Sequence, residues 1–91
     1  MVRRNKNGFI ISSEYDPYIM EFLKKYGQSK YREIIDYIHQ KIGSLFKSAD
    51  TEGSYHGWIV WKHQVSEALF SLKKDGLIGL QGRKYYIIPH Y

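Results

Sequence analysis

The chain contains no cysteine, which excludes disulfide bonds, zinc sites built on thiolates and cysteine nucleophiles. It also lacks long apolar runs, because the longest extend over only a few residues, too few to cross a bilayer. No repeat, low-complexity tract or proline-rich linker divides its 91 residues. We therefore expect one domain with a modest core, residues 8–91, in a reduced, cytoplasmic protein.

Acidic residues are in the minority. Nine Asp and Glu stand against 14 Lys and Arg, which gives a formal net charge of +5 and an isoelectric point near 9.4. Such an excess favours anionic partners, nucleic acid first. The start of the chain is basic but lacks the apolar stretch of a signal peptide, so we expect residues 1–7 to form a mobile basic arm. Arg3 and Arg4 of this arm are candidate DNA contacts.

Three stretches have the apolar periodicity of helices. An Asp-Pro pair, typical of a helix start, predicts the first helix over residues 16–26. Ser29 is predicted to cap the second helix, whose apolar stripe continues to Leu45. A third helix is predicted over residues 61–74. We expect the three stripes to share one core, made of Phe22, Leu23, Ile34, Ile38, Trp61, Val65, Leu69 and Leu72.

Short strands are predicted after the third helix, over residues 77–80 and 85–88. Gln81-Gly82 between them fits a tight hairpin turn, with glycine supplying the positive φ. Residues 9–11 are too short to stand alone but could add a third, N-terminal edge strand.

The stretch between the second and third helices is less regular. Residues 48–57 carry two glycines and no apolar period, which predicts a loop. Residues 58–60 fit either a short strand or the lead into the third helix.

This order of elements, with a basic hairpin directly after the third helix, predicts an α+β fold of the winged helix-turn-helix type, with three helices and a small antiparallel hairpin wing. In such a domain the third helix, here residues 61–74, docks in the major groove of double-stranded DNA, and the wing, here residues 80–85, contacts the backbone. Side chains at the start of the helix bond base edges or phosphates, and basic side chains at the wing tip bond phosphates. The candidate DNA contacts are Lys62, His63, Gln64, Ser66, Glu67, Lys73, Lys74, Arg83 and Lys84, with Arg3 and Arg4 from the arm.

Each candidate contact has an alternative interpretation, and two residues of the third helix, Glu67 and Phe70, fit DNA contact less well than the others. Any single surface Lys or Arg can equally be part of a solvated face. Glu67 would be repelled by phosphates unless its carboxylate accepts from a cytosine amino group. Phe70 is apolar and lies opposite the core stripe, which indicates a partner subunit, a thymine methyl group or a misplaced helical wheel. We favour the subunit, because small regulators double their base contacts as symmetric homodimers, and the tyrosines of the first helix are the other possible seam.

One segment resembles a known family. It reads Trp61-x3-Val65-x2-Ala68-Leu69-x2-Leu72-Lys73-Lys74-x-Gly76-Leu77-Ile78, followed by Gly82-Arg83-Lys84-Tyr85-Tyr86-Ile87. This pattern resembles the N-terminal winged-helix domain of Mrr-type restriction proteins over about residues 58–88; the likeness is weak over the first two helices and absent from the arm. The resemblance implies DNA binding. It implies no cleavage, because the chain stops at Tyr91, before the domain that cuts DNA in that family.

Other chemistry has little support in the sequence. His39, His56, His63 and His90 show no metal-binding spacing, and no glycine-rich phosphate loop occurs. We therefore expect no enzyme, no catalytic residue, no metal and no cofactor, and predict a small transcriptional regulator, with a composition that suits an archaeal or viral source. The alternative is a winged-helix module that docks proteins, with RNA binding third. A DNA binder should gather its basic side chains on one face, whereas a docking module should show an apolar patch around Phe70 and Trp58.

Overall fold

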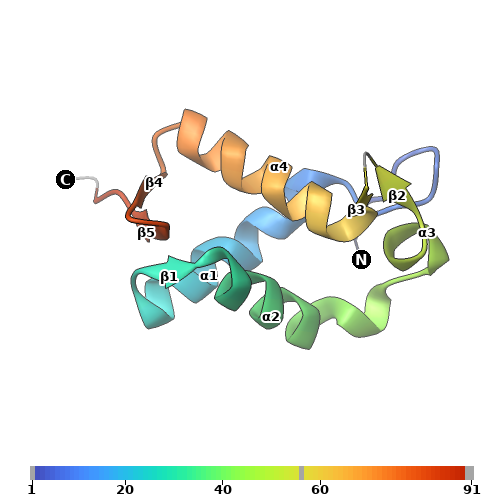
Figure 1. Ribbon diagram of the computed structural model, residues 1–91, viewed down its shortest axis with the longest axis horizontal. Helices are drawn as coiled ribbons and strands as arrows, with labels where there is room; N and C mark the ends of the chain where they lie inside the picture. The colour runs from blue at the N-terminus through green and yellow to red at the C-terminus, as the bar shows by residue number, and fades with distance from the viewer. Residues whose placement is uncertain (1, 56, 90–91) are drawn as a thin grey trace.

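The computed structural model describes residues 2–55 and 57–89, apart from the side chains of residues 54 and 55. The fold is α+β, as predicted, with α1 and α2 on one side of α4 and a three-stranded sheet at one end (Figure 1). The elements are η1 (Ser12–Tyr15), α1 (Asp16–Tyr26), β1 (Ser29–Lys30), α2 (Tyr31–Ile42), η2 (Gly43–Leu45), α3 (Ser48–Thr51), β2 (Ser54–Tyr55), β3 (Trp58–Ile59), α4 (Val60–Lys74), β4 (Ile78–Gln81) and β5 (Lys84–Ile87).

Helices α1 and α4 form where the apolar periodicity predicts them. Helix α1 has the predicted bounds, with Pro17 in its first turn and Gly27 at its end. Helix α4 begins one residue earlier than predicted and ends at Lys74. All eight predicted core residues are buried, and Ile10 and Tyr15 from the N-terminal part join them in the same cluster. The core prediction is confirmed.

The start of α2 differs from the prediction. Ser29 does not cap the helix but is buried in β1, and Tyr31 is the first helical residue. The backbone N–H of Lys30 donates to Glu33 Oε1 at 2.8 Å, so a carboxylate from inside the first turn takes the capping role. Leu45 lies beyond the helix in η2 and is exposed rather than part of the core stripe.

The sheet has the order β1-β5-β4, and both pairings are antiparallel. Its third strand therefore comes from Ser29–Lys30 and not from residues 9–11, where Ile10 forms an isolated bridge with Arg4. Strands β4 and β5 are each shifted by one residue from the predicted ranges. The register pairs Gln81 with Lys84, which places the two-residue turn at Gly82-Arg83 rather than at Gln81-Gly82.

The turn has positive φ at both central residues, 56° at Gly82 and 68° at Arg83, the pattern of a type I′ hairpin turn. Arg83 is the one non-glycine residue with positive φ in the described chain, and a side chain there is strained. A second glycine, Gly79 in β4, lets the ring of Tyr86, its cross-strand partner, lie close to the backbone, because a Cβ on Gly79 would lie 2.5 Å from the far end of this ring. This ring covers the bare backbone of β4.

The connection between α2 and α4 is structured, contrary to the predicted loop over residues 48–57. It contains α3, and β2 pairs with β3 in a small hairpin at the end of the molecule opposite the sheet (Figure 1). Asp50 stabilises the part of this connection around α3, because its buried carboxylate accepts hydrogen bonds from the backbone N–H groups of Lys47 and Ile10, at 3.0 and 2.8 Å. Both interpretations of residues 58–60 are correct in part, since Trp58–Ile59 is a strand and Val60 begins α4.

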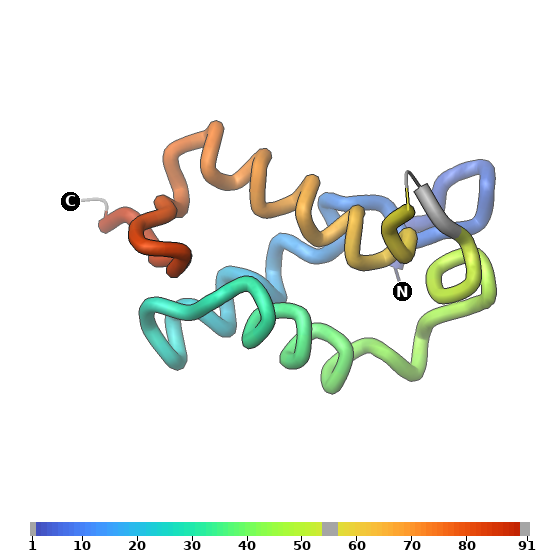
Figure 2. Tube along the Cα trace, viewed as in Figure 1, coloured from blue at the N-terminus to red at the C-terminus, as the bar shows by residue number. Residues whose placement is uncertain are grey.

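The N-terminal segment is attached to the rest of the fold, so the prediction of a mobile arm over residues 1–7 is wrong for its described part. The guanidinium of Arg4 donates to Asp50 Oδ2 at 2.8 Å and to the carbonyl oxygens of Gly8 and Leu45, both at 2.7 Å. Arg3 contacts Glu14 through its backbone N–H, at 3.0 Å, and its side chain, at 3.4 Å. Figure 2 shows the segment, in blue, at the same end of the molecule as α3.

Candidate nucleic-acid interface

The outer face of α4 carries four of the singled-out residues. His63, Glu67, Phe70 and Lys74 follow one another at intervals of three and four, opposite the buried stripe. His63 Nε2 lies 3.5 Å from Glu67 Oε1, so a carboxylate and an imidazole form one polar unit on this face. Phe70 is 60% exposed, as its position on the wheel predicts. An imidazole, a carboxylate and an ammonium group on one face can all bond base edges or phosphates.

The flank of α4 that faces α2 carries Lys62, Ser66 and Lys73, spaced by four and seven residues. Ser66 Oγ lies 3.2 Å from both the hydroxyl of Tyr31 and the carbonyl oxygen of Lys62, and the Tyr31 hydroxyl donates to the same carbonyl at 3.3 Å. Ser66 thus fixes α2 against α4 and is removed from the candidate DNA contacts. Lys62 and Lys73 remain.

Tyr31 is the link between this flank and the wing. It is half-buried, and burial raises the pKa of its hydroxyl; the bond from Ser66 lowers that pKa, and the nearby Tyr85 raises it. Tyr31 directly follows Lys30, and Tyr85 directly follows Lys84. The contacts of one tyrosine therefore bring the start of α4, the start of α2 and strand β5 together.

The edge of the wing concentrates positive charge. Lys30 in β1 lies directly opposite Lys84 in β5, and Arg83 precedes Lys84 in the turn; all three are exposed. Like charges directly opposite each other in an antiparallel pair are destabilising. The sequence alone does not identify Lys30 as part of the wing, because a two-residue strand leaves no alternation to recognise.

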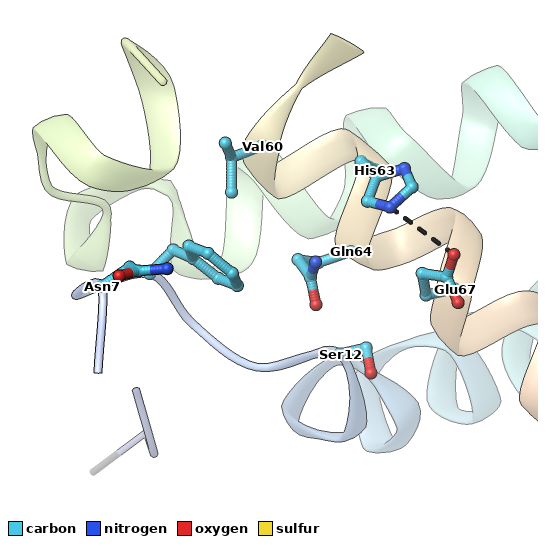
Figure 3. A pocket seen from close by; sticks show the side chains of 7 residues that line it. Asn7, Ser12, Val60, His63, Gln64 and Glu67 are labelled. Atoms are coloured by element: carbon cyan, nitrogen blue, oxygen red, sulfur yellow. Dashed lines mark ion pairs between the residues drawn. The ribbon is translucent and has the colours of Figure 1, made fainter. Parts of the chain in front are cut away.

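A groove of about 550 Å³ runs along the other flank of α4, between its first two turns and the N-terminal segment (Figure 3). Gln64 points into this groove rather than outward beside His63, and His63 and Glu67 form part of its lining. The N-terminal side of the groove comes from the predicted arm, the segment that follows it and η1. These wall residues are Asn7, Phe9 and Ser12, with Val60 at the helix start.

The two arginines predicted as an arm are engaged within the protein. Arg4 is half-buried and its guanidinium donates to oxygens of Gly8, Leu45 and Asp50, so it stabilises the fold and is removed from the candidate DNA contacts. Arg3 is exposed and shares its charge with Glu14 at 3.4 Å. The basic contribution of the N-terminal segment to a DNA surface is therefore smaller than predicted.

Within residues 2–55 and 57–89, no three His, Asp or Glu side chains gather into a metal-binding group, and no helix is long and apolar enough to cross a bilayer. His56 and His90 lie outside the described residues.

Comparison with known proteins adds no relative. No protein-family model, curated protein or solved structure matches the chain. The resemblance to the N-terminal domain of Mrr-type proteins therefore depends on the residue pattern alone and stays a prediction.

Proposed function

We propose that the domain is a winged helix that binds double-stranded DNA, as a small transcriptional regulator or a DNA-binding module. The element order supports this, because α1, β1, α2, α4, β4 and β5 follow one another as helices and strands do in a winged helix. The sheet order supports it too, since the short strand after the first helix pairs with the last strand of the hairpin. In this proposal α4 lies in the major groove and the wing contacts the backbone.

One departure concerns the helix-turn-helix itself. Such a motif joins its helices by a turn of about 3–4 residues. Here residues 43–59, with η2, α3 and the β2–β3 hairpin, separate α2 from α4. The tyrosine contact between α2 and α4 keeps the two helices together despite this longer connection.

The observation that carries the proposal is the wing edge, where Lys30 and Lys84 are opposed and Arg83 is strained. Both features cost stability in the free protein. A phosphate between the lysines would replace their repulsion by two attractive contacts, because each ammonium group donates to phosphate oxygens. A duplex backbone supplies phosphates at this surface.

The test is a titration of duplex DNA at several salt concentrations. Replacing Arg83 and Lys84 together by Ala should lower the salt slope of binding by about 1–2 units, because each phosphate contact releases roughly one counterion. The matched control replaces Lys41 and Lys47 by Ala. Both are exposed and lie away from the sheet, Lys41 in the last turn of α2 and Lys47 just before α3. An unchanged slope in the Arg83/Lys84 variant, or an equal loss in the control, would contradict DNA binding through the wing.

A second function is favoured by a different observation. Phe70 is 60% exposed and Trp58 is 50% exposed, so two large apolar side chains stand free on α4 and just before it. A module that docks a protein partner through α4 would use such side chains as anchors. The same titration separates the two classes, because a docking module would bind duplex DNA with neither high affinity nor a wing-dependent salt slope.

A further inference from the structure

The groove beside α4 has a lining with two kinds of surface. Phe9 and Val60 provide an aromatic and an aliphatic surface, and the remaining lining side chains are polar: Asn7, Ser12, His63, Gln64 and Glu67. Its volume of about 550 Å³ falls within the range of small-molecule sites, roughly 300–1,000 Å³. A ligand for this groove needs a flat apolar face and a polar edge.

Asn7, Ser12 and Gln64 are among the polar side chains that line the groove. Within the described ranges, the side chains of Asn7, Ser12 and Gln64 make no hydrogen bond to another part of the protein. In Figure 3 the Gln64 amide extends from α4 toward the N-terminal segment, between Asn7 and Ser12. Two carboxamides and a hydroxyl offer donors and acceptors together, which suits a ligand with both kinds of group along one edge.

The charge of the groove argues against a phosphate inside it. Glu67 lines the groove, and its carboxylate lies 3.5 Å from His63 Nε2. A carboxylate repels a phosphate and accepts hydrogen bonds from amino and ring N–H groups. The groove thus differs from the wing edge, where lysines and an arginine gather, and an uncharged ligand fits it best.

We propose that this groove receives a nucleobase turned out of a DNA duplex. A carboxamide pairs with two groups on the edge of adenine at once, and an aromatic ring stacks on the face of any base. Gln64 and Asn7 supply the carboxamides and Phe9 supplies the ring. The inference rests on the proposed function, because DNA bound to α4 brings bases to the mouth of the groove.

The hairpin before α4 offers a group to fill the space that the base leaves. Trp58 and Ile59 are 50% and 41% exposed and directly precede Val60, which lines the groove. Apolar side chains inserted between base steps unstack a duplex, and they replace part of the lost stacking. Trp58, Ile59 and the groove therefore lie at the same end of α4. In this proposal the pair fills the gap in the duplex while the groove holds the base.

The experiment uses duplexes in which a target adenine, paired with thymine or mispaired with cytosine, lies directly beside 2-aminopurine, a base whose fluorescence rises when its stacking neighbour is turned out. We expect saturating protein to raise the fluorescence of both duplexes, and more strongly that of the mispaired one, because an unpaired base is cheaper to turn out. Gln64→Ala should reduce the response about tenfold, the cost of one lost bidentate contact. Gln40→Ala, an exposed glutamine on α2, is the matched control and should respond like the parent.

Each other outcome has a distinct meaning. Duplex binding with the wing-dependent salt slope but without any fluorescence rise overturns this inference and leaves DNA binding intact. Absence of duplex binding overturns both. Adenosine alone is added while the side-chain amide signals of Gln64 and Asn7 are followed by NMR. A response to adenosine without one to either duplex would assign the groove to a free nucleoside and overturn the extruded base.

Discussion

At the scale of single residues, Arg83 shows most directly that the free protein is not at its stability optimum. Its φ of 68° lies in the left-handed region, which costs an L residue about 1–2 kcal/mol relative to the right-handed one. Glycine adopts this conformation without that cost. An arginine is therefore retained in the turn at the expense of stability, as expected for a residue that contacts a ligand.

Replacing Arg83 by Gly should stabilise the protein and weaken DNA binding. We expect the free energy of unfolding to rise by about 1 kcal/mol, since the strain is removed but the unfolded chain gains freedom. Urea unfolding measures the first effect, and the duplex titration measures the second. Gly82→Ala, at the neighbouring position with φ of 56°, should lower the free energy of unfolding instead. A destabilised Arg83→Gly variant would show that the arginine side chain stabilises the turn.

Single residues were also where sequence reasoning failed most often. Arg4 and Asp50 are 46 positions apart, and no local pattern announces that they form an ion pair of 2.8 Å. Ser66 was predicted to contact DNA because it lies on helix three, but its direction toward Tyr31 depends on how α2 packs. Side-chain roles set by tertiary partners cannot be obtained from spacing along one helix.

At the scale of elements, apolar periodicity was sufficient wherever a helix packs on the core. The stripe of α4 predicted all five of its buried positions from Trp61 to Leu72. The strands β1 and β2 were missed, and β3 was one of two alternatives, because two-residue strands carry no period. The wing was found but shifted, since its register depends on the two-residue turn at Gly82-Arg83.

Leu69 tests the packing of α4. Leu69→Ala should lower the free energy of unfolding by about 2–5 kcal/mol, because the substitution loses the free energy gained by burying the leucine side chain and leaves a cavity. The adjacent Phe70→Ala is the control on the same helix and should change it by less than about 0.5 kcal/mol in the monomer. Chemical denaturation of both variants at low protein concentration gives the comparison. Equal losses would mean that the outward and inward faces of α4 are assigned wrongly.

At the scale of the whole molecule, α4 has to contact both DNA and a second copy of the chain if the protein binds DNA as a dimer. Phe70 lies seven residues after His63, which is about 10 Å along a helix. Base contacts concentrate in the first half of a recognition helix. The second half, with Phe70, is then available for a second copy without competing for DNA.

We predict a homodimer at micromolar concentration, with Phe70 in the seam. Sedimentation velocity should show the parent as a dimer and Phe70→Ser as a monomer with an unchanged far-ultraviolet circular dichroism spectrum, because the side chain contributes to the interface and not to the core. Tyr26→Ser, at another exposed ring on α1, is the control and should remain dimeric. A parent protein that stays monomeric at high concentration would contradict the prediction.

The pairing of β1 with β5 has a consequence for synthesis on the ribosome. Lys30 of β1 is translated 54 positions before Lys84, its partner in β5. A nascent chain can form α1 and α2 by local contacts, yet Lys30 and Lys84 meet only once β5 has left the exit tunnel. Because such non-local pairing comes late, the sheet and its basic edge form after the helices. In the proposed function, a nascent chain therefore gains a wing that can hold DNA only after β5 has emerged.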